Sequence, residues 1–147
     1  HKFVTANELK EDESGYYRQE PVYIHTTEYI PLSEFLVPEY MNSLIDKYNE
    51  ADSQEKTRFE KICEFKRNFE RIHPFIDGNG RTGRAVMNLL FLQNGYGYIS
   101  FPVDERDKYF QSLEDNTFYL LATDKMLNCM EQIKENHLKR EAYDYER

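Results

Sequence analysis

One run of twelve residues constrains this chain more than any other part of it. Residues 73–84 read His-Pro-Phe-Ile-Asp-Gly-Asn-Gly-Arg-Thr-Gly-Arg. Pro74 ends the amphipathic helix predicted before it, because proline has no N–H donor and its ring clashes with a helical backbone. Gly78 and Gly80 then precede a second apolar segment. The run therefore predicts two helices joined by a turn that carries an imidazole, a carboxylate and two guanidiniums.

Apolar residues recur at helical spacing along most of the chain. We expect helices to start at Pro38, to span about 53–72 and 80–94, to follow a cap at Asp104, and to span about 118–136. The stretch 85–92 is apolar apart from Asn88, which predicts a central buried helix. In the last helix the side chains expected to face inward are Leu121, Met126, Cys129, Met130 and Ile133.

A single segment has the composition of a strand pair. Residues 21–31 combine β-branched and aromatic side chains between two prolines, which predicts one short β-hairpin at about residues 20–30. The expected fold class is therefore an all-α bundle with one short β-hairpin. We expect one domain over residues 1–136, followed by a charged tail over residues 137–147.

Composition narrows the functional class. The net charge of −8 argues against sequence-independent binding of nucleic acid. No apolar run approaches the ~20 residues of a membrane helix and no signal peptide is visible, so we expect a cytoplasmic protein without membrane contact. The chain begins at His1 rather than Met, so a missing N-terminal segment could hold targeting or regulatory sequence. Cys63 and Cys129 are expected to be small buried hydrophobes in a reducing compartment rather than a disulfide.

The turn at Gly78-Asn79-Gly80 has the features of an anion site. Two glycines permit positive φ and close backbone approach, so successive N–H groups can converge on an anion. The following helix adds the positive end of its dipole, and Arg81 and Arg84 share its first turn. Guanidiniums hold phosphate oxygens bidentately. Taken alone, the turn has an alternative interpretation, in which the glycines only start a helix and the two arginines are solvated.

The same glycines also satisfy G-x-G-x-x-G, at Gly78, Gly80 and Gly83, with Asp104 at a suitable distance for a ribose contact. A dinucleotide-binding fold is nevertheless excluded, because that fingerprint needs a β-strand before the first glycine. Here an amphipathic helix precedes it. The chain also lacks the lysine of a P-loop.

His73 and Asp77 supply a candidate base and a candidate metal ligand. A neutral imidazole titrates near working pH and suits removal of a hydroxyl proton. Asp77 could bind Mg²⁺ bridging phosphates, because this hard cation prefers oxygen ligands. In isolation His73 would be a helix cap or core residue and Asp77 a turn residue. Their spacing to the anion turn favours instead a general base at His73 and a metal ligand at Asp77. A zinc site is not expected from the other histidines, His1, His25 and His137.

Residues 73–84 match the signature of the Fic family, HxFx[DE]GNGRxxR, at every defined position. The chain resembles that family over roughly residues 1–130, and Gly15-Tyr-Tyr-Arg18 with Val22-Tyr-Ile24 resembles the entry to the family's flap hairpin. Fic proteins typically transfer AMP from ATP onto a hydroxyl side chain of another protein. The resemblance therefore implies a Fic-type bundle and a protein adenylyltransferase that uses Mg²⁺ and ATP.

The resemblance also assigns roles. His73 would activate the target hydroxyl for attack on the α-phosphate of ATP, and Asp77 would bind Mg²⁺. The backbone of Gly78, Asn79 and Gly80 would form the anion hole, with Asn79 also touching phosphate. The β and γ phosphates would be held by Arg81 and Arg84, and pyrophosphate would leave.

Two further groups of residues are implied for substrate contacts. An exposed hairpin edge at Tyr23, Ile24 and His25 could pair with an extended target segment and align its Ser, Thr or Tyr. Tyr109 and Asn116 resemble family positions near the adenine, although the spacing after Glu114 is one residue shorter than in the family.

Many Fic proteins carry an inhibitory helix with [ST]-x-x-x-E-[GN], whose glutamate pairs with the second motif arginine, here Arg84. Glu135-Asn136 has the right ending, but Glu131 stands where Ser or Thr should be. We expect the inhibitory helix to lie upstream of His1 or on another chain.

Alternative functions remain within and outside this chemistry. The family also includes kinase-like and phosphocholine-transferring variants, and Gly80 in place of a bulkier residue favours the AMP orientation. A form bearing the inhibitor could remove AMP instead. From a different class, the chain could be an inactive nucleotide-dependent module that recruits a partner, although an intact His73 counts against this.

Overall fold

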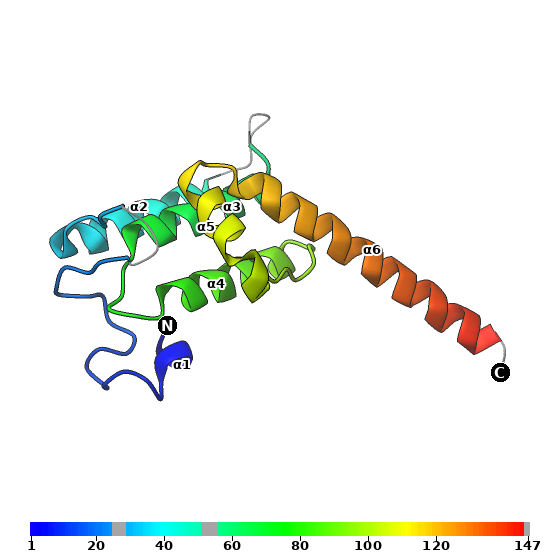
Figure 1. The fold of residues 1–147 in the computed structure, drawn as a ribbon, viewed down its shortest axis with the longest axis horizontal. Helices are drawn as coiled ribbons and strands as arrows, with labels where there is room; N and C mark the ends of the chain where they lie inside the picture. The colour runs from blue at the N-terminus through cyan, green and yellow to red at the C-terminus, as the bar shows by residue number, and fades with distance from the viewer. Residues whose placement is uncertain (25–28, 51–55, 146–147) are drawn as a thin grey trace. The chain divides into compact units, whose positions relative to one another are not determined.

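The computed structural model describes residues 1–24, 29–50 and 56–145, and each regular element in these ranges is helical (Figure 1). The chain divides into two compact units, His1–Leu90 and Phe91–Arg147. The α-helices are α1 (Lys2–Thr5), α2 (Val37–Asn49), α3 (Arg58–Ile72), α4 (Asn79–Gln93), α5 (Arg106–Glu114) and α6 (Phe118–Tyr145). Short 3-10 turns lie at Glu34–Leu36 and Val103–Glu105.

The core of the first unit forms where α2 lies beside α3 (Figure 1). Pro38 occupies the first turn of α2, where its missing N–H costs nothing. Phe75, from the loop after α3, inserts into the same core, as its apolar character predicts. Each such side chain contributes about 1.5–3 kcal/mol when fully buried. The cluster consists of Val37, Met41, Leu44, Phe65, Phe69, Ile72 and Phe75.

A capping box fixes the start of α3. The Glu60 N–H donates to the Thr57 hydroxyl, and the Thr57 N–H donates to the Glu60 carboxylate at 2.7 Å. Helix α3 therefore begins at Arg58, later than the expected position near residue 53. The sequence signal Thr57-x-x-Glu60 carries this information. Residues 51–55 lie outside the described ranges.

The side chain of Arg18 joins separate segments of the first unit. It is 3% exposed, and its Nε donates to the His73 carbonyl at 2.8 Å. The two Nη groups donate to the carbonyls of Glu20 at 3.0 Å and Leu32 at 2.6 Å. One of them also approaches the Ile72 carbonyl at 3.5 Å. The rigid fork of a guanidinium suits this many acceptors.

The expected β-hairpin at residues 20–30 is wrong for the part of the segment that the structure describes. Residues 20–24 and 29–32 form no strand, and His25 lies outside the described ranges. The two described ends of the segment are joined by the Arg18 side chain, which bonds to Glu20 and Leu32, and not by hydrogen bonds between paired strands. Pro21 and Pro31 cannot donate to a ladder, and Tyr23 is 78% exposed. A two-stranded ribbon without a buried face is marginal in water.

The second unit is built on an aromatic cluster and on the pairing of α5 with α6. The ring of Phe101 lies 4.7 Å from that of Tyr109 and 5.8 Å from that of Phe118. The expected cap at Asp104 does not form. Asp104 lies within the Val103–Glu105 turn, and α5 begins at Arg106 without a side-chain cap.

Helix α6 continues through residues expected to form a tail. Residues 137–145 contain no Gly or Pro and are rich in strong helix formers, so nothing stops the helix at 136. His137 and Glu141 pair at i,i+4 on its surface at 3.3 Å. Met130 and Ile133 are 50% and 56% exposed, so the expectation that both face inward is wrong. Within the described ranges, no helix is both long and apolar enough to cross a membrane.

Arg18→Lys should lower the free energy of unfolding by about 2–4 kcal/mol. Lysine keeps the charge but cannot reach carbonyls on three segments, and each buried carbonyl left without a donor costs ~1–3 kcal/mol. Urea denaturation followed by circular dichroism measures this change. Arg140→Lys, on the exposed part of α6, is the matched control. Equal stability of the two variants would show that the Arg18 bonds do not hold the first unit together.

Candidate functional site

His73 sits at the C-terminus of α3 in a strained backbone conformation. Its φ of 50° and ψ of 61° lie in the left-handed region, which non-glycine residues adopt rarely. Its N–H donates to the Phe69 carbonyl at 3.0 Å, and its carbonyl accepts the 2.8 Å bond from Arg18. The next carbonyl, on Pro74, accepts the Arg18 N–H at 2.9 Å. This conformation turns the chain sharply out of α3.

The hydrogen bonds of the His73 ring determine which nitrogen can act as a base. Nδ1 lies 3.2 Å from the Glu70 carbonyl. A carbonyl only accepts, so Nδ1 carries the proton and Nε2 keeps its lone pair in the neutral ring. Burial lowers the pKa of His73, and the contact with Glu70 opposes this shift only in part. The neutral, proton-accepting ring is therefore favoured.

The side chain of Asn79 folds the loop between His73 and α4. Its Oδ1 accepts the Phe75 N–H at 2.9 Å, and its Nδ2 donates to the Phe75 carbonyl at 2.8 Å. Asn79 is 2% exposed. Its amide thus closes the loop onto the backbone of the residue that is anchored in the core.

The start of α4 presents backbone donors. Thr82 N–H donates to the Gly78 carbonyl at 2.9 Å, so α4 begins directly after Gly78. The first N–H groups of an α-helix have no partner within it, and here they belong to Asn79, Gly80 and Arg81. The Gly78 N–H instead donates to the Asp77 carboxylate at 2.6 Å.

Both motif arginines lie beside the turn. Arg84 is half-buried, and its Nη1 lies 3.3 Å from the place a Cβ on Gly80 would occupy. An Nη atom of Arg81 lies 3.7 Å from the equivalent place on Gly78. The structure therefore brings together the helix start and the two guanidiniums, as their spacing predicts.

The N-terminal segment packs over this turn. His1 stacks on Phe75 with ring centres 3.8 Å apart. Its Nδ1 accepts the Gly15 N–H at 2.9 Å, so its Nε2 carries the proton and donates to the Asp77 carbonyl at 2.9 Å. The Thr5 methyl lies 2.6 Å from the position of a Cβ on Gly78, which therefore has to be glycine.

Glu8 engages the first motif arginine in a bidentate pair. Its carboxylate accepts from Arg81 at 2.5 Å through one oxygen and more closely through the other. This bond lowers the pKa of Glu8 and raises the pKa of Arg81. Asp77 lies farther from the same guanidinium, at 3.9 Å.

The residues that fit a divalent cation are few. The Asp77 side chain is 68% exposed and lies next to the helix start. No cluster of three or more His, Cys, Asp or Glu that could hold a metal occurs in the described part of the chain. Mg²⁺ does not require such a cluster, because it commonly uses one or two carboxylates together with substrate phosphates and water. Asp77 fits that mode.

The other predicted residues lie on other segments of the chain. Tyr23 is exposed and Ile24 is half-buried, at the end of the described range 1–24. In the second unit, Tyr109 is 3% exposed within its aromatic cluster and Asn116 follows α5 with a φ of 64°. Glu135 lies on the exposed surface of α6.

Comparison with known proteins shows the family of this chain. Residues 1–91 match the model of the Fic/DOC family, and the chain belongs to that family. It is 31% identical over 101 residues to a Caenorhabditis elegans protein named protein adenylyltransferase fic-1, covering 69% of this chain and 20% of that protein. It is 51% identical over 43 residues to a Drosophila yakuba protein named protein adenylyltransferase Fic, which is 29% of this chain and 9% of the relative. The chain thus spans a fifth or less of these relatives.

Solved structures show the same fold. A C. elegans Fic-1 structure superposes with a TM-score of 0.75 at 25% identity, over 95% of this chain and 42% of that one. A Fic-domain signalling protein from Bacteroides thetaiotaomicron gives a TM-score of 0.71 at 26% identity, over 80% of this chain and 53% of that protein.

The pKa of His73 should lie below the ordinary value of about 6.5, because burial disfavours the imidazolium. NMR titration of the ring proton measures it, and His73→Gln identifies the resonance by its disappearance. A midpoint above 6.5 would mean that Glu70 outweighs burial.

Asn79→Ala should lower the free energy of unfolding by about 2–4 kcal/mol without any nucleotide present, because two buried groups of Phe75 lose their partners. Urea denaturation measures this, with the exposed Asn136→Ala as control. An unchanged stability would contradict a folding role for this amide.

Proposed function

We propose that this chain is the catalytic Fic domain of a protein adenylyltransferase, which transfers AMP from ATP to a hydroxyl of a target protein. The observation that carries the proposal is the His73 ring with an Nε2 lone pair at the end of α3, joined through residues 74–78 to a helix start that is flanked by two arginines. The names of the relatives support AMP as the transferred group.

The chemistry follows from these positions. The target hydroxyl gives its proton to Nε2 of His73 as its oxygen forms a bond to the α-phosphorus of ATP. The bond from that phosphorus to the bridging oxygen breaks, and pyrophosphate leaves. The N–H groups at the start of α4 and the guanidiniums of Arg81 and Arg84 stabilise the negative charge on the phosphates. Catalysis rests on positioning and charge, not on a covalent enzyme intermediate.

Asp77 is the residue that would hold Mg²⁺. This cation, when bound, would neutralise phosphate charge and align the leaving group. The Asp77 carbonyl is held by His1 and its carboxylate by the Gly78 N–H, so the side chain is already oriented at the rim of the turn.

Asn79 serves this site through its backbone. Its side-chain amide is committed to Phe75, so we assign its contribution to the anion hole to its N–H group. The amide's role is to hold the turn in shape.

Incubation with α-labelled ATP and Mg²⁺ tests the proposal. We expect covalent label on the chain or on added proteins, and a loss of ~10²–10⁴-fold in His73→Ala with ATP binding retained. Asp77→Ala should lose activity and should no longer respond to Mg²⁺.

Three outcomes would contradict the proposal. Reversible ATP binding without covalent label would indicate a nucleotide-dependent binding module. Label from γ-labelled but not α-labelled ATP would indicate a kinase-like reaction. Near-normal labelling by His73→Ala would remove this residue from the role of base.

A further inference from the structure

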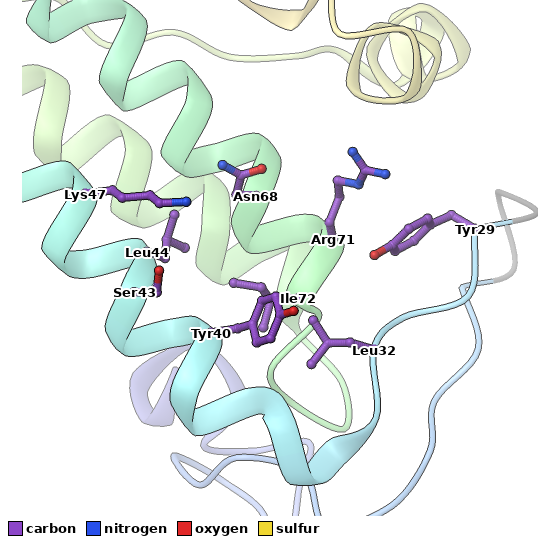
Figure 2. A pocket seen from close by; sticks show the side chains of 9 residues that line it. All are labelled: Tyr29, Leu32, Tyr40, Ser43, Leu44, Lys47, Asn68, Arg71 and Ile72. Atoms are coloured by element: carbon purple, nitrogen blue, oxygen red, sulfur yellow. The ribbon is translucent and has the colours of Figure 1, made fainter.

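A second site lies in the first unit, on the side of α3 that faces α2 (Figure 2). It is a cavity of about 270 Å³ between these two helices and the segment that precedes α2. Leu32, Leu44 and Ile72 form its apolar lining, and the last two are 5% exposed. Pockets that hold drug-sized ligands measure ~300–1,000 Å³, so this one suits a single amino-acid side chain better than a nucleotide.

The charged residues at this cavity are cationic. Lys47 reaches from α2 toward α3, and Arg71 stands on the last turn of α3 (Figure 2). The guanidinium of Arg71 lies 4.9 Å from the ring centre of Tyr29, and this contact orients the guanidinium. Tyr29 also lines the cavity. No carboxylate occurs among the described residues that line the cavity. This is notable in a chain with 27 acidic and 19 basic residues.

Neutral polar groups complete the lining. Tyr40 and Ser43 lie on the same face of α2 as Lys47, and Asn68 lies one turn before Arg71 on α3. A ligand that combines a planar anion with a short apolar stem would match the cations, these donors and the apolar wall together. The side chains of Asp and Glu have this chemistry.

The cavity is tied to the candidate base through Arg18. Ile72, which lines the cavity, directly precedes His73. Arg18 donates to the carbonyls of Leu32, Ile72 and His73 at 2.6, 3.5 and 2.8 Å. One buried group therefore bonds both to the wall of the cavity and to the residue that supplies the candidate base.

We propose that this cavity is a specificity site that binds an acidic side chain of the target protein, close in sequence to the hydroxyl that accepts AMP. The proposal rests on the proposed function for the identity of the reaction, but the binding preference itself does not require transfer. It names a substrate class: hydroxyl residues flanked by Asp or Glu.

Binding of two fluorescein-labelled peptides tests it. Both carry the same Ser, Thr and Tyr residues, and they differ only in flanking Glu or Gln. Fluorescence anisotropy should show the Glu peptide binding about tenfold more tightly, as expected for a charge-assisted bond at a partly exposed site. The preference should shrink as salt is raised.

Variants that reverse or remove a charge locate the preference. Lys47→Glu should remove it, and Arg71→Gln should reduce it. Lys139→Glu, an equal change in net charge on the exposed part of α6, should leave it intact. Circular dichroism confirms that each variant is folded. Equal binding of both peptides to the unaltered chain, or equal loss in Lys47→Glu and Lys139→Glu, would overturn the proposal.

The transfer assay on the same peptides separates this inference from the proposed function. AMP transfer without any preference for the Glu peptide would leave the function standing and overturn the acidic site. A Lys47-dependent preference in binding without transfer to any peptide would support the site and contradict the function.

Discussion

The buried guanidinium of Arg18 is the interaction on which the first unit depends. It donates to the carbonyls of Glu20 and Leu32 and to that of His73 at the end of α3, while its own backbone N–H donates to the Pro74 carbonyl. The left-handed conformation of His73 costs ~1–3 kcal/mol and persists only if its surroundings determine it. The bonds from Arg18 and to Phe69 supply that determination. The chain therefore leaves α3 in one direction, which sets where the following turn lies.

A second constraint comes from close packing around the turn itself. Phe75 is fixed in the core, His1 stacks on its ring, and Asn79 closes the loop on its backbone. Gly83 permits α4 to approach α3, since a Cβ there would lie 2.9 Å from the Phe69 ring and 3.0 Å from the Lys66 ammonium. Gly78, which the sequence assigns to the anion turn, also has a steric reason to be glycine, and the reason at Gly83 is steric alone.

The sequence was sufficient for the helices and for the motif, but not for the contacts between distant segments. Periodic apolar residues locate α2, α3 and α4. The capping-box pattern Thr57-x-x-Glu60 also indicates in the sequence where α3 begins. The hairpin prediction is wrong for the described part of residues 20–30, because strand propensity reflects a fit to a sheet, and the residues that the structure describes form no strand with which Tyr23 could pair. The pairing of Glu8 with Arg81 and the stacking of His1 cannot be read from spacing, since they join residues more than seventy positions apart.

The two carboxylates near the turn differ in how easily they can move. The bond between Glu8 and Arg81 is exposed and open to screening by salt, so it adds little to stability. Under the proposed function, a polyphosphate that also reached the α4 N–H groups would displace it readily. Glu70 is different, because it pairs with the fully buried Lys66 and lies 3.9 Å from the position of a Cβ on Gly80. Breaking a buried pair leaves an uncompensated charge, which is strongly destabilising. Glu70 is therefore held in place near the turn, and under the proposed function its pairing with Lys66 would reduce the repulsion between its carboxylate and a bound phosphate. Glu8 is therefore the carboxylate that an incoming anion would replace as the partner of Arg81.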